Sequence, residues 1–548
     1  MTLEFASIWT RDSRAAPVMI FLLALLFFCI NLDRPPHPDE LHHVLAAERL
    51  LETGRPLIGE GEYRRGILHT WMVAVSYEIF GDGLASARLP AALLVALAAA
   101  VLFLWVRREA GAIPAWITTS LFVLSPFSVE IAQFSRFYAL QIVFFLLGSI
   151  WVFYLLAPAV SFARRTLLAG LGATLLALAI WQQVTTYFGI AALAIWVFAC
   201  VVQWVFFNPA AHLAWKRVFA AGVVAVAVLA LVVITQTDMM EWAVKTYGRA
   251  SLFNADRQDE FWFYFVRYFV FYPTLWSLIG LLAVFAVVHS PRLAWLAVCV
   301  FGISFLLVSF AGSKAMRYFS FAQPFLAIVW GVGMAYALVP LSAFAEAARV
   351  RLAATFTLPQ RIGSRIATSL MVLAFAIVLI MNPFWLRTAT LIGDVALPYD
   401  NPVTDWSAAK ERLGPLVKDV DIMITTEELG AIYYLGRSDV RFSPSKIREL
   451  APDQRKEFGI DHRTGRPIIT TPESLERLIE CFPRGLVVGP IEHWGSPILI
   501  SKTVQAVIRK YARPFDVPEK SHLYAWSWER NLDGMRPEYC SDLDQVFR

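Results

Sequence analysis

The chain has 548 residues, of which 58% are hydrophobic and 17% are charged, and its mean hydropathy is +0.56. Soluble domains carry about 25% charged residues, so this balance excludes an ordinary soluble protein and indicates a chain that lies largely in lipid. The formal net charge of +5 is too small to predict a nucleic-acid partner.

Long apolar segments recur along the first two thirds of the chain. A helix needs about 20 apolar residues to cross a bilayer, so these segments predict about eleven membrane-spanning helices. They lie near residues 15–32, 86–106, 113–129, 139–157, 167–181, 188–207, 217–236, 265–289, 293–310, 319–340 and 368–386. An odd number of spans places the two termini on opposite sides of the membrane.

Basic residues predict which side is which, because cytoplasmic loops of membrane proteins are enriched in Lys and Arg. The basic residues of alternate loops are Arg11, Arg14, Arg107, Arg108, Arg164, Arg165, Lys216, Arg217, Arg292, Arg349, Arg351, Arg361 and Arg365. Acidic residues are prominent in the opposite loops. We therefore expect a cytoplasmic N-terminus, a first segment that is an uncleaved anchor, and a C-terminal part on the outer side.

A cluster of polar residues directly follows the first apolar segment: His37, Asp39, Glu40, His42 and His43. Pro38 favours a helix that starts at the acidic pair, where the helix dipole keeps carboxylates ionised. In one interpretation the two acids are purely structural. In the other they are catalytic, because an ionised carboxylate beside the bilayer can remove the proton of an acceptor hydroxyl that attacks an activated sugar.

The same cluster raises the question of a metal. His37 and His42, with Asp39 or Glu40, could ligate a divalent ion. Histidine-rich turns at an interface are more often solvated, so we expect no metal here and keep a divalent ion as the weaker alternative.

A second cluster lies in the segment EIAQFSRFYALQ, residues 130–141, between two expected spans. Glu130 and Arg136 are ionisable groups close to the hydrocarbon, where charges are costly and are often functional. The structural alternative is a salt bridge between Glu130 and Arg136.

A third cluster, Lys314, Arg317 and Tyr318, lies in an expected outward turn, where the charge rule disfavours basic residues. A lipid phosphate would satisfy both cations, since Arg can grip phosphate through two hydrogen bonds and Lys acts as a point charge. Anchoring to anionic lipid headgroups is the alternative. The aromatic, amphipathic loop 237–264 is a candidate lid over the site, although interfacial aromatics explain most of it.

The composition changes at about residue 387, where charges become frequent and long apolar runs stop. We expect strands at 421–426, 431–436, 468–471, 485–490 and 522–528 and helices at 405–417, 472–482 and 499–511. This alternation predicts a small α/β domain. Outside the cytoplasm Cys481 and Cys540 could form a disulfide, and two reduced thiols are the alternative.

The first outward loop resembles that of the GT-C glycosyltransferases. The resemblance is carried by PDE (38–40), ERLLETGRPL (48–57), GILHTWMVAVSYEIFG (66–81) and ASARLP (85–90), and its most specific part is Asp39-Glu40 combined with Arg88-Leu89-Pro90. Within that family, the loop most resembles the branch that contains the aminoarabinose transferase of lipid A, the bacterial protein O-mannosyltransferases and the rhizobial lipopolysaccharide sugar transferases. It covers residues 30–140, and the later spans only in style.

The resemblance implies roles for the candidate residues. Asp39 would act as the base, with Glu40 as its neighbour or substitute. Where the lipid A enzymes have a lysine and prolines, this chain has Arg64 and Arg65, which would take over a phosphate contact. The donor phosphate would be bound by Arg136, Lys314, Arg317, Arg64 and Arg65, and the cavity would be lined by Glu130, Tyr138, Tyr318, His42 and His43.

We therefore expect a polytopic α-helical membrane protein of GT-C type with a C-terminal extracytoplasmic α/β domain. Residues 1–386 would form the membrane domain, with the first outward loop at 33–85, and residues 387–548 the soluble domain. The resemblance implies a bacterial inner-membrane glycosyltransferase that uses a polyprenyl-phosphate sugar, inverts the anomeric carbon and modifies a glycan, lipid or protein acceptor. The rival interpretations are a flippase or transporter and a noncatalytic scaffold.

Overall fold

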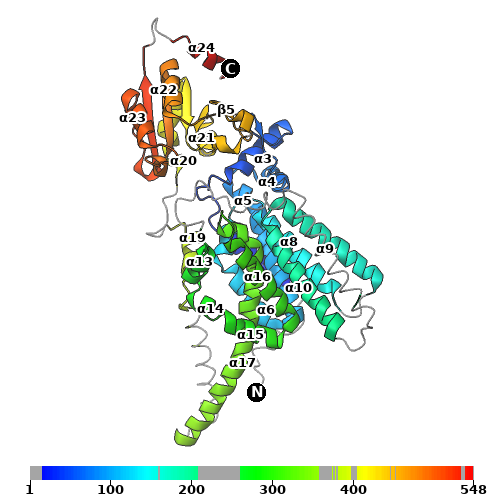
Figure 1. Ribbon diagram of the computed structural model, residues 1–548. Helices are drawn as coiled ribbons and strands as arrows, with labels where there is room; N and C mark the ends of the chain where they lie inside the picture. The colour runs from blue at the N-terminus through cyan, green and yellow to red at the C-terminus, as the bar shows by residue number, and fades with distance from the viewer. Residues whose placement is uncertain are drawn as a thin grey trace. The chain divides into compact units, whose positions relative to one another are not determined.

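The structure is a computed structural model in which the chain forms two compact units (Figure 1). It describes residues 15–157, 161–207, 260–356, 380–395, 404–531 and 537–546, except 445 and 451, together with single residues at 217, 373 and 377. Unit 1 comprises Met1–Ile30, Ala91–Gln133 and Phe137–Val395. Unit 2 comprises Asn31–Pro90, Phe134–Arg136 and Ala396–Arg548. Unit 2 therefore combines the loop after the first helix with the C-terminal segment. The domain boundary expected near residue 387 stays a prediction.

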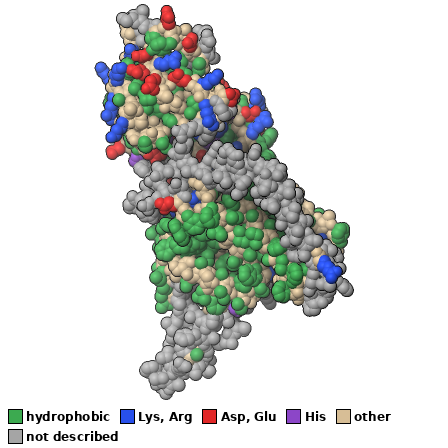
Figure 2. Space-filling view, viewed as in Figure 1, with side chains coloured by type: hydrophobic (Ala, Val, Ile, Leu, Met, Phe, Trp, Pro, Cys, Tyr) green, Lys and Arg blue, Asp and Glu red, His purple; other side chains and the backbone are tan. Residues whose placement is uncertain are grey.

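Unit 1 is helical. Its elements are α2 (Ala15–Phe28), most of α5 (Leu84–Ala110), α6 (Ala112–Val123), α7 (Pro126–Ala132), α8 (Tyr138–Leu155), α9 (Phe162–Gln182), α10 (Thr186–Phe207), α13 (Phe263–Phe271), α14 (Pro273–Ser277), α15 (Ile279–His289), α16 (Pro291–Ser309), η1 (Met316–Ala322), α17 (Gln323–Phe356) and α19 (Phe384–Ile392). Figure 2 shows hydrophobic side chains over the surface of these helices, as expected of helices in contact with lipid.

Six helices among the described residues are long and apolar enough to cross a membrane, or seven if the bent pair α6 and α7 is one span. The six are Leu84–Ala110, Tyr138–Leu155, Phe162–Gln182, Thr186–Phe207, Pro291–Ser309 and Met316–Leu338, and each overlaps an expected span. The pair α6 and α7 overlaps another, bent by 63°. The protein is thus a multi-pass membrane protein, while the count of eleven stays a prediction.

The span expected at 265–289 stays a prediction, because this segment is broken into α13, α14 and α15. Pro273 occupies the first position of α14, where its missing N–H does no harm, and it disfavours helical geometry at the preceding Tyr272. Only α2, a helix of 14 residues, represents the expected span at 15–32 in the described chain. The expected spans at 217–236 and 368–386 fall largely outside the described residues.

In unit 1, α8 and α9 pack closely because glycines face each other across the contact. A Cβ atom on Gly148 would lie 2.9 Å from Leu176 Cδ2, and one on Gly172 would lie 3.4 Å from Val152 Cγ2. Small residues of this kind let two helix backbones approach in a membrane, where burial of apolar surface contributes little.

Unit 2 begins with the first outward loop. Its elements are α3 (Leu41–Thr53), the hairpin of β1 (Leu57–Ile58) and β2 (Gly61–Glu62), and α4 (Ile67–Phe80), after which α5 begins. Gly54 ends α3 in the left-handed conformation, with φ of +74°, which glycine adopts without strain. The apolar face of α3, including Leu41 and Val44, belongs to one buried cluster with Leu429 of α21 (Glu428–Leu435). This cluster joins the loop to the C-terminal segment.

The C-terminal segment folds as a seven-stranded sheet in the order β5-β6-β4-β3-β7-β9-β8. The strands are β3 (Ile422–Thr425), β4 (Val440–Phe442), β5 (Gly459–Ile460), β6 (Pro467–Ile469), β7 (Arg484–Pro490), β8 (Arg513–Pro514) and β9 (Leu523–Glu529). The four central strands β6, β4, β3 and β7 are parallel. The accompanying helices are α20 (Trp406–Asp419), α21, α22 (Pro472–Cys481), α23 (Lys502–Tyr511) and α24 (Cys540–Val546).

The expected α/β character is therefore confirmed, with four of the five expected strands and all three expected helices. The strand expected at 431–436 is wrong, since this run lies in α21. An acidic residue, Glu428, opens that helix and Gly436 ends it in the left-handed conformation, two signals that outweigh a short apolar run. Of the two alternatives for Cys481 and Cys540, the structure has the disulfide, with 5.4 Å between the Cα atoms.

Candidate active site

The acidic pair of the first loop forms a tight turn immediately before α3. The backbone N–H of Glu40 donates to His37 O at 2.9 Å, and the N–H of His37 donates to Glu40 Oε1 at 2.9 Å. The N–H of Asp39 donates to His37 Nδ1 at 3.1 Å. Pro38 lies inside this turn, so the sequence signal for a helix that starts at the acidic pair is confirmed to within one residue.

Glu40 is held in a buried ion pair with Arg88. Arg88 Nε donates to Glu40 Oε2 and Nη2 to Oε1, both at 2.8 Å, and the two side chains are only 1% and 3% exposed. The N–H of Ser135 donates to Oε2 at 3.0 Å. Burial alone would raise the pKa of the Glu40 carboxyl, but Arg88 and the two backbone N–H groups outweigh it and lower the pKa. Both oxygens are thus engaged in hydrogen bonds, and a role for Glu40 as a substitute base stays a prediction.

Asp39 is held in place through its backbone carbonyl. Arg136, which is 4% exposed, donates from Nη1 to Asp39 O at 2.6 Å. The Asp39 side chain is only partly buried. Asp39 is therefore less buried than Glu40, and its role as the base stays a prediction.

The histidines that follow are buried and neutral. His42 Nδ1 lies 3.2 Å from Asp39 O, and the ring stacks on Tyr63 at 4.9 Å. His43 Nδ1 lies 2.9 Å from Thr70 Oγ1, and its ring meets the His69 ring edge-on at 4.9 Å. Burial, followed by nearby cations, holds the pKa of both His42 and His43 well below the ordinary value.

These histidines do not fit a metal site. In the described part of the chain no group of three or more His, Cys, Asp or Glu side chains is placed to hold a metal ion. Both ring nitrogens of His42 face protein groups, and His37 Nδ1 accepts from the Asp39 backbone. The weaker alternative of a metal held by His37 and His42 thus gains no support.

Arg64 and Arg65 lie in the exposed turn between the hairpin and α4. Arg64 pairs with Glu62 at 3.0 Å, with 77% of its side chain exposed. A phosphate role for either arginine stays a prediction.

The candidates of unit 1 come partly together. The rings of Tyr138 and Tyr318, from the second and third clusters of the sequence, lie 6.3 Å apart, and the Arg317 guanidinium lies 5.5 Å above the Tyr318 ring. Lys314 is 2% exposed. Glu130 is half-buried in α7. Unit 1 thus groups one arginine with two tyrosines, while the roles proposed for all five residues stay predictions.

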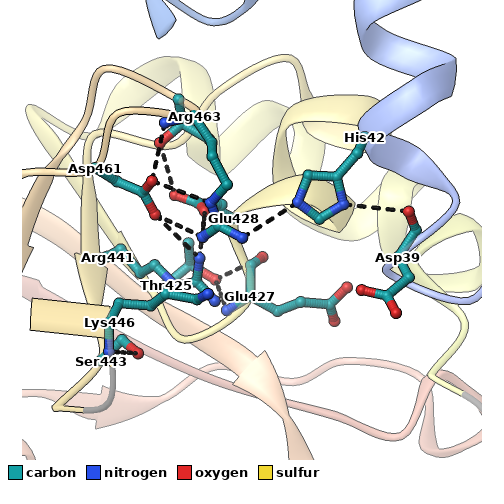
Figure 3. A network of polar contacts seen from close by, with 11 residues as sticks. Asp39, His42, Thr425, Glu427, Glu428, Arg441, Ser443, Lys446, Asp461 and Arg463 are labelled. Atoms are coloured by element: carbon teal, nitrogen blue, oxygen red, sulfur yellow. Dashed lines mark hydrogen bonds and ion pairs between the residues drawn. The ribbon is translucent and has the colours of Figure 1, made fainter. Parts of the chain in front are cut away.

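Sequence reasoning missed the partners that the C-terminal segment contributes to unit 2. Arg463 Nη1 lies 3.4 Å from His42 Nε2, and Figure 3 shows this contact beside Asp461, Glu428 and Arg441. The spacing Asp461-x-Arg463 in a polar turn was the one available signal. The sequence places Arg88 in the motif Arg88-Leu89-Pro90 but does not indicate its role. The proposed lid at 237–264 lies almost wholly outside the described residues.

No family model matches the chain. A curated relative, the undecaprenyl phosphate-alpha-4-amino-4-deoxy-L-arabinose arabinosyl transferase of Shewanella sediminis (strain HAW-EB3), is 30% identical over 118 residues. The match spans 21% of this chain and 22% of that protein, about a fifth of the relative's length.

Solved structures match over nearly the whole chain. ArnT from Cupriavidus metallidurans in the apo state matches with a TM-score of 0.57 and 16% identity, over 93% of this chain and 97% of that one. The chain has a GT-C glycosyltransferase fold. The same ArnT bound to undecaprenyl phosphate matches with a TM-score of 0.57 and 16% identity, over 94% and 98% of the two chains.

The GT-C fold extends to a more distant relative. The archaeal oligosaccharyltransferase AglB from Archaeoglobus fulgidus, in complex with an inhibitory peptide and a dolichol-phosphate, matches with a TM-score of 0.53 and 10% identity, over 92% of this chain and 73% of that one. The resemblance inferred from the first loop is thus confirmed at the level of the fold. A shared fold does not by itself fix a reaction, which has to be argued from the site.

Proposed function

We propose that this GT-C protein is a glycosyltransferase that moves a sugar from a polyprenyl-phosphate donor to an acceptor hydroxyl on the outer side of a bacterial inner membrane. The observation that carries the proposal is the placement of Asp39, a partly exposed carboxylate whose backbone is fixed by the buried Arg136. A full-length match to an ArnT structure bound to undecaprenyl phosphate supports the choice of donor.

In the proposed reaction the Asp39 carboxylate accepts the proton of the acceptor hydroxyl as the oxygen attacks the anomeric carbon of the donor sugar. A new carbon–oxygen bond forms on one face of the sugar. The bond from the anomeric carbon to the phosphate oxygen breaks on the other face, so the configuration inverts. The electron pair leaves with the phosphate, which is already a stable anion at neutral pH, and no general acid is needed.

The leaving phosphate needs cations, since charge develops on its oxygen as the bond breaks. We assign this role to Lys314 and Arg317, because both come from one turn whose tyrosine, Tyr318, already contacts Arg317. Arg64 and Arg65 are the exposed candidates for an additional contact. Arg136 is assigned to hold Asp39, since its Nη1 donates to the Asp39 carbonyl.

A hollow in unit 2 supports a sugar as the acceptor. It encloses about 310 Å³ and is lined by Asp33, Pro35, Leu84, Ser407, Tyr433 and Tyr434. The rings of Tyr433 and Tyr434 lie 4.8 Å apart, edge to face. Aromatic faces beside a carboxylate and a hydroxyl suit the apolar faces and hydroxyl groups of a glycan. None of the described lining residues is basic, which disfavours an anionic ligand.

The disulfide supports the proposed location of the C-terminal segment. Disulfides persist in oxidising compartments such as the periplasm and are rare in the cytoplasm. The bond between Cys481 and Cys540 is therefore in keeping with a C-terminal part on the outer side of the membrane.

The proposal is tested by replacing Asp39 with Asn in cells that lack the native gene and analysing surface glycans and lipids by mass spectrometry. The wild-type gene should restore a sugar that the deletion strain lacks, and Asp39→Asn should not. Glu52→Gln removes an exposed carboxylate from the far end of α3 and should restore the sugar fully. Full restoration by Asp39→Asn at normal protein levels would rule out Asp39 as the base.

A further inference from the structure

The turn between β5 and β6 holds one arginine in a fixed position. Arg463 donates from Nε and Nη2 to the Asp461 carboxylate at 3.1 and 2.7 Å, and Nη2 lies 3.7 Å from Glu428 Oε1. Glu428 is 1% exposed; it also accepts from Thr464 Oγ1 at 3.0 Å and pairs with Arg441. Asp461 and Glu428 also face Arg441, so two carboxylates balance the charges of two arginines, and Arg463 is poorly suited to bind a phosphate (Figure 3).

The same turn is registered against the first outward loop by backbone contacts. The N–H of Glu60, at the tip of the β1–β2 hairpin, donates to Thr464 O at 3.1 Å. A Cβ atom on Gly465 would lie 2.7 Å from Glu60 Cβ, so only glycine fits between the two segments. Gly465 also has φ of +69°, a conformation that glycine adopts without strain. This close approach sets where Arg463 meets the first loop.

At that place Arg463 meets His42. Arg463 Nη1 lies 3.4 Å from His42 Nε2, and on the other side of the ring His42 Nδ1 lies 3.2 Å from Asp39 O. A guanidinium can only donate, so Nε2 has to accept, and the ring proton is left on Nδ1. That Nδ1–H then donates to the Asp39 carbonyl, which also accepts from Arg136 Nη1 at 2.6 Å. Arg136 Nη1 lies 3.4 Å from His42 Nδ1 as well, so the contacts of Nδ1 alone do not fix the tautomer, and the contact of Nε2 with Arg463 decides it.

We propose that Arg463 is a positioning residue for the reaction, which selects the Nδ1–H tautomer of His42 and thereby holds the Asp39 peptide in place. With the proton on Nε2 instead, His42 Nδ1 and Asp39 O would both be acceptors and would compete for the N–H of Arg136, and the turn that carries the Asp39 carboxylate would shift. The C-terminal α/β segment would thus complete the site around the base. This inference rests on the proposed function.

The arrangement at the sheet supports such a role. Thr425 ends β3, and Glu427 and Glu428 follow it at the carboxyl end of a central parallel strand. Binding and catalytic groups of open α/β sheets gather at the carboxyl ends of their strands. Here Glu428 pairs with Arg463, which contacts His42, and Arg441 of the neighbouring strand pairs with Glu428 and Asp461.

The test measures the tautomer directly. Purified full-length protein labelled with ¹⁵N-histidine is compared by solid-state NMR with Arg463→Ala, and the His42 signals are assigned by their loss in His42→Asn. Wild-type His42 should be in the Nδ1–H form, and Arg463→Ala should lose that form. The matched control is Arg466→Ala, which removes an ion pair of the same turn to Glu60 at 3.3 Å and should change nothing. Retention of the Nδ1–H form in Arg463→Ala would overturn the inference.

A second arm measures sugar transfer in the deletion strain. Arg463→Ala should lower product formation at least tenfold, and Arg466→Ala less than twofold. In the His42→Asn variant, the Asn side-chain amide can donate an N–H to Asp39 O and does not depend on Arg463. Adding Arg463→Ala to that variant should therefore lower product formation less than twofold. If Asp39→Asn is inactive and Arg463→Ala matches wild type, this inference fails and the proposed function stands. If Asp39→Asn is active, the proposed function fails, and the NMR result alone decides the tautomer.

Discussion

Replacing Arg88 by Met should destabilise the protein strongly and make its stability fall as pH rises. Arg88 makes two hydrogen bonds to Glu40 and others to the carbonyls of Leu32 and Arg34, at 2.6 and 2.8 Å. Removing one partner of such a buried pair costs about 3–5 kcal/mol, because the remaining charge is buried without compensation. The unsatisfied carbonyls add to this cost by about 1–3 kcal/mol each where water cannot reach them.

The sign of the pH dependence follows from Glu40. In the wild type its folded pKa is below its ordinary value, so its contribution is complete at neutral pH and is lost only as pH falls through the acidic range. Without Arg88 the buried carboxyl is ionised less readily than in the unfolded chain, so stability is lost as pH rises from about 5 to 8. The slope can reach about 1.4 kcal/mol per pH unit.

The assay is denaturant unfolding of the purified protein in detergent, followed by tryptophan fluorescence at pH 5.5 and pH 8. The double variant Glu40→Gln, Arg88→Met should remove the pH dependence that Arg88→Met introduces. Arg49→Met, which breaks an exposed pair with Glu52 on α3, should change the free energy of unfolding by less than about 1 kcal/mol. An Arg88→Met protein as stable as the wild type at pH 8 would refute the reasoning.

Three further predictions concern binding and pH. Arg317→Ala should raise the donor KM about tenfold, a loss of about 1.4 kcal/mol, whereas Arg267→Ala, which removes a stack on Phe263, should not; steady-state kinetics with varied donor decide this. Tyr434→Ala should raise the KM for the acceptor and leave the donor KM unchanged, and equal acceptor KM values would count against the sugar-binding hollow. Because the pKa of His42 is lowered in the folded protein, the free energy of unfolding should decrease as the pH is lowered below about 6.5. His42→Asn should make that decrease smaller in unfolding experiments.

Features that depend on local sequence could be predicted. The long apolar runs gave six clear spans, and the Pro38-Asp39-Glu40 turn before α3 was visible from its helix-start signals. The position of Asp39 was therefore accessible, and so was the α/β character of the C-terminal segment. Its alternating strands and helices carry their own caps, such as Thr471 before α22.

Features that depend on distant contacts could not be predicted. Nothing near Glu40 in the sequence shows that Arg88 takes both its oxygens, and nothing near His42 shows that Arg463, 421 positions away, faces its ring. The break at Pro273 was locally visible, but apolar residues on both sides made the segment resemble one span. For the run 431–436 hydrophobicity alone did not distinguish a strand from a helix.

The shared cluster of Leu41, Val44 and Leu429 has a consequence for biosynthesis. At about 5–20 residues per second, the ribosome needs roughly 20–80 s to reach the later residue after making the earlier ones. During that time α3 can pack on α4 but lacks its contact with Leu429. A chain cut before the C-terminal segment would leave exposed the part of the cluster that Leu429 covers. Truncation therefore also removes a buried contact of the first loop, and a shortened protein would be a target for chaperones and proteases.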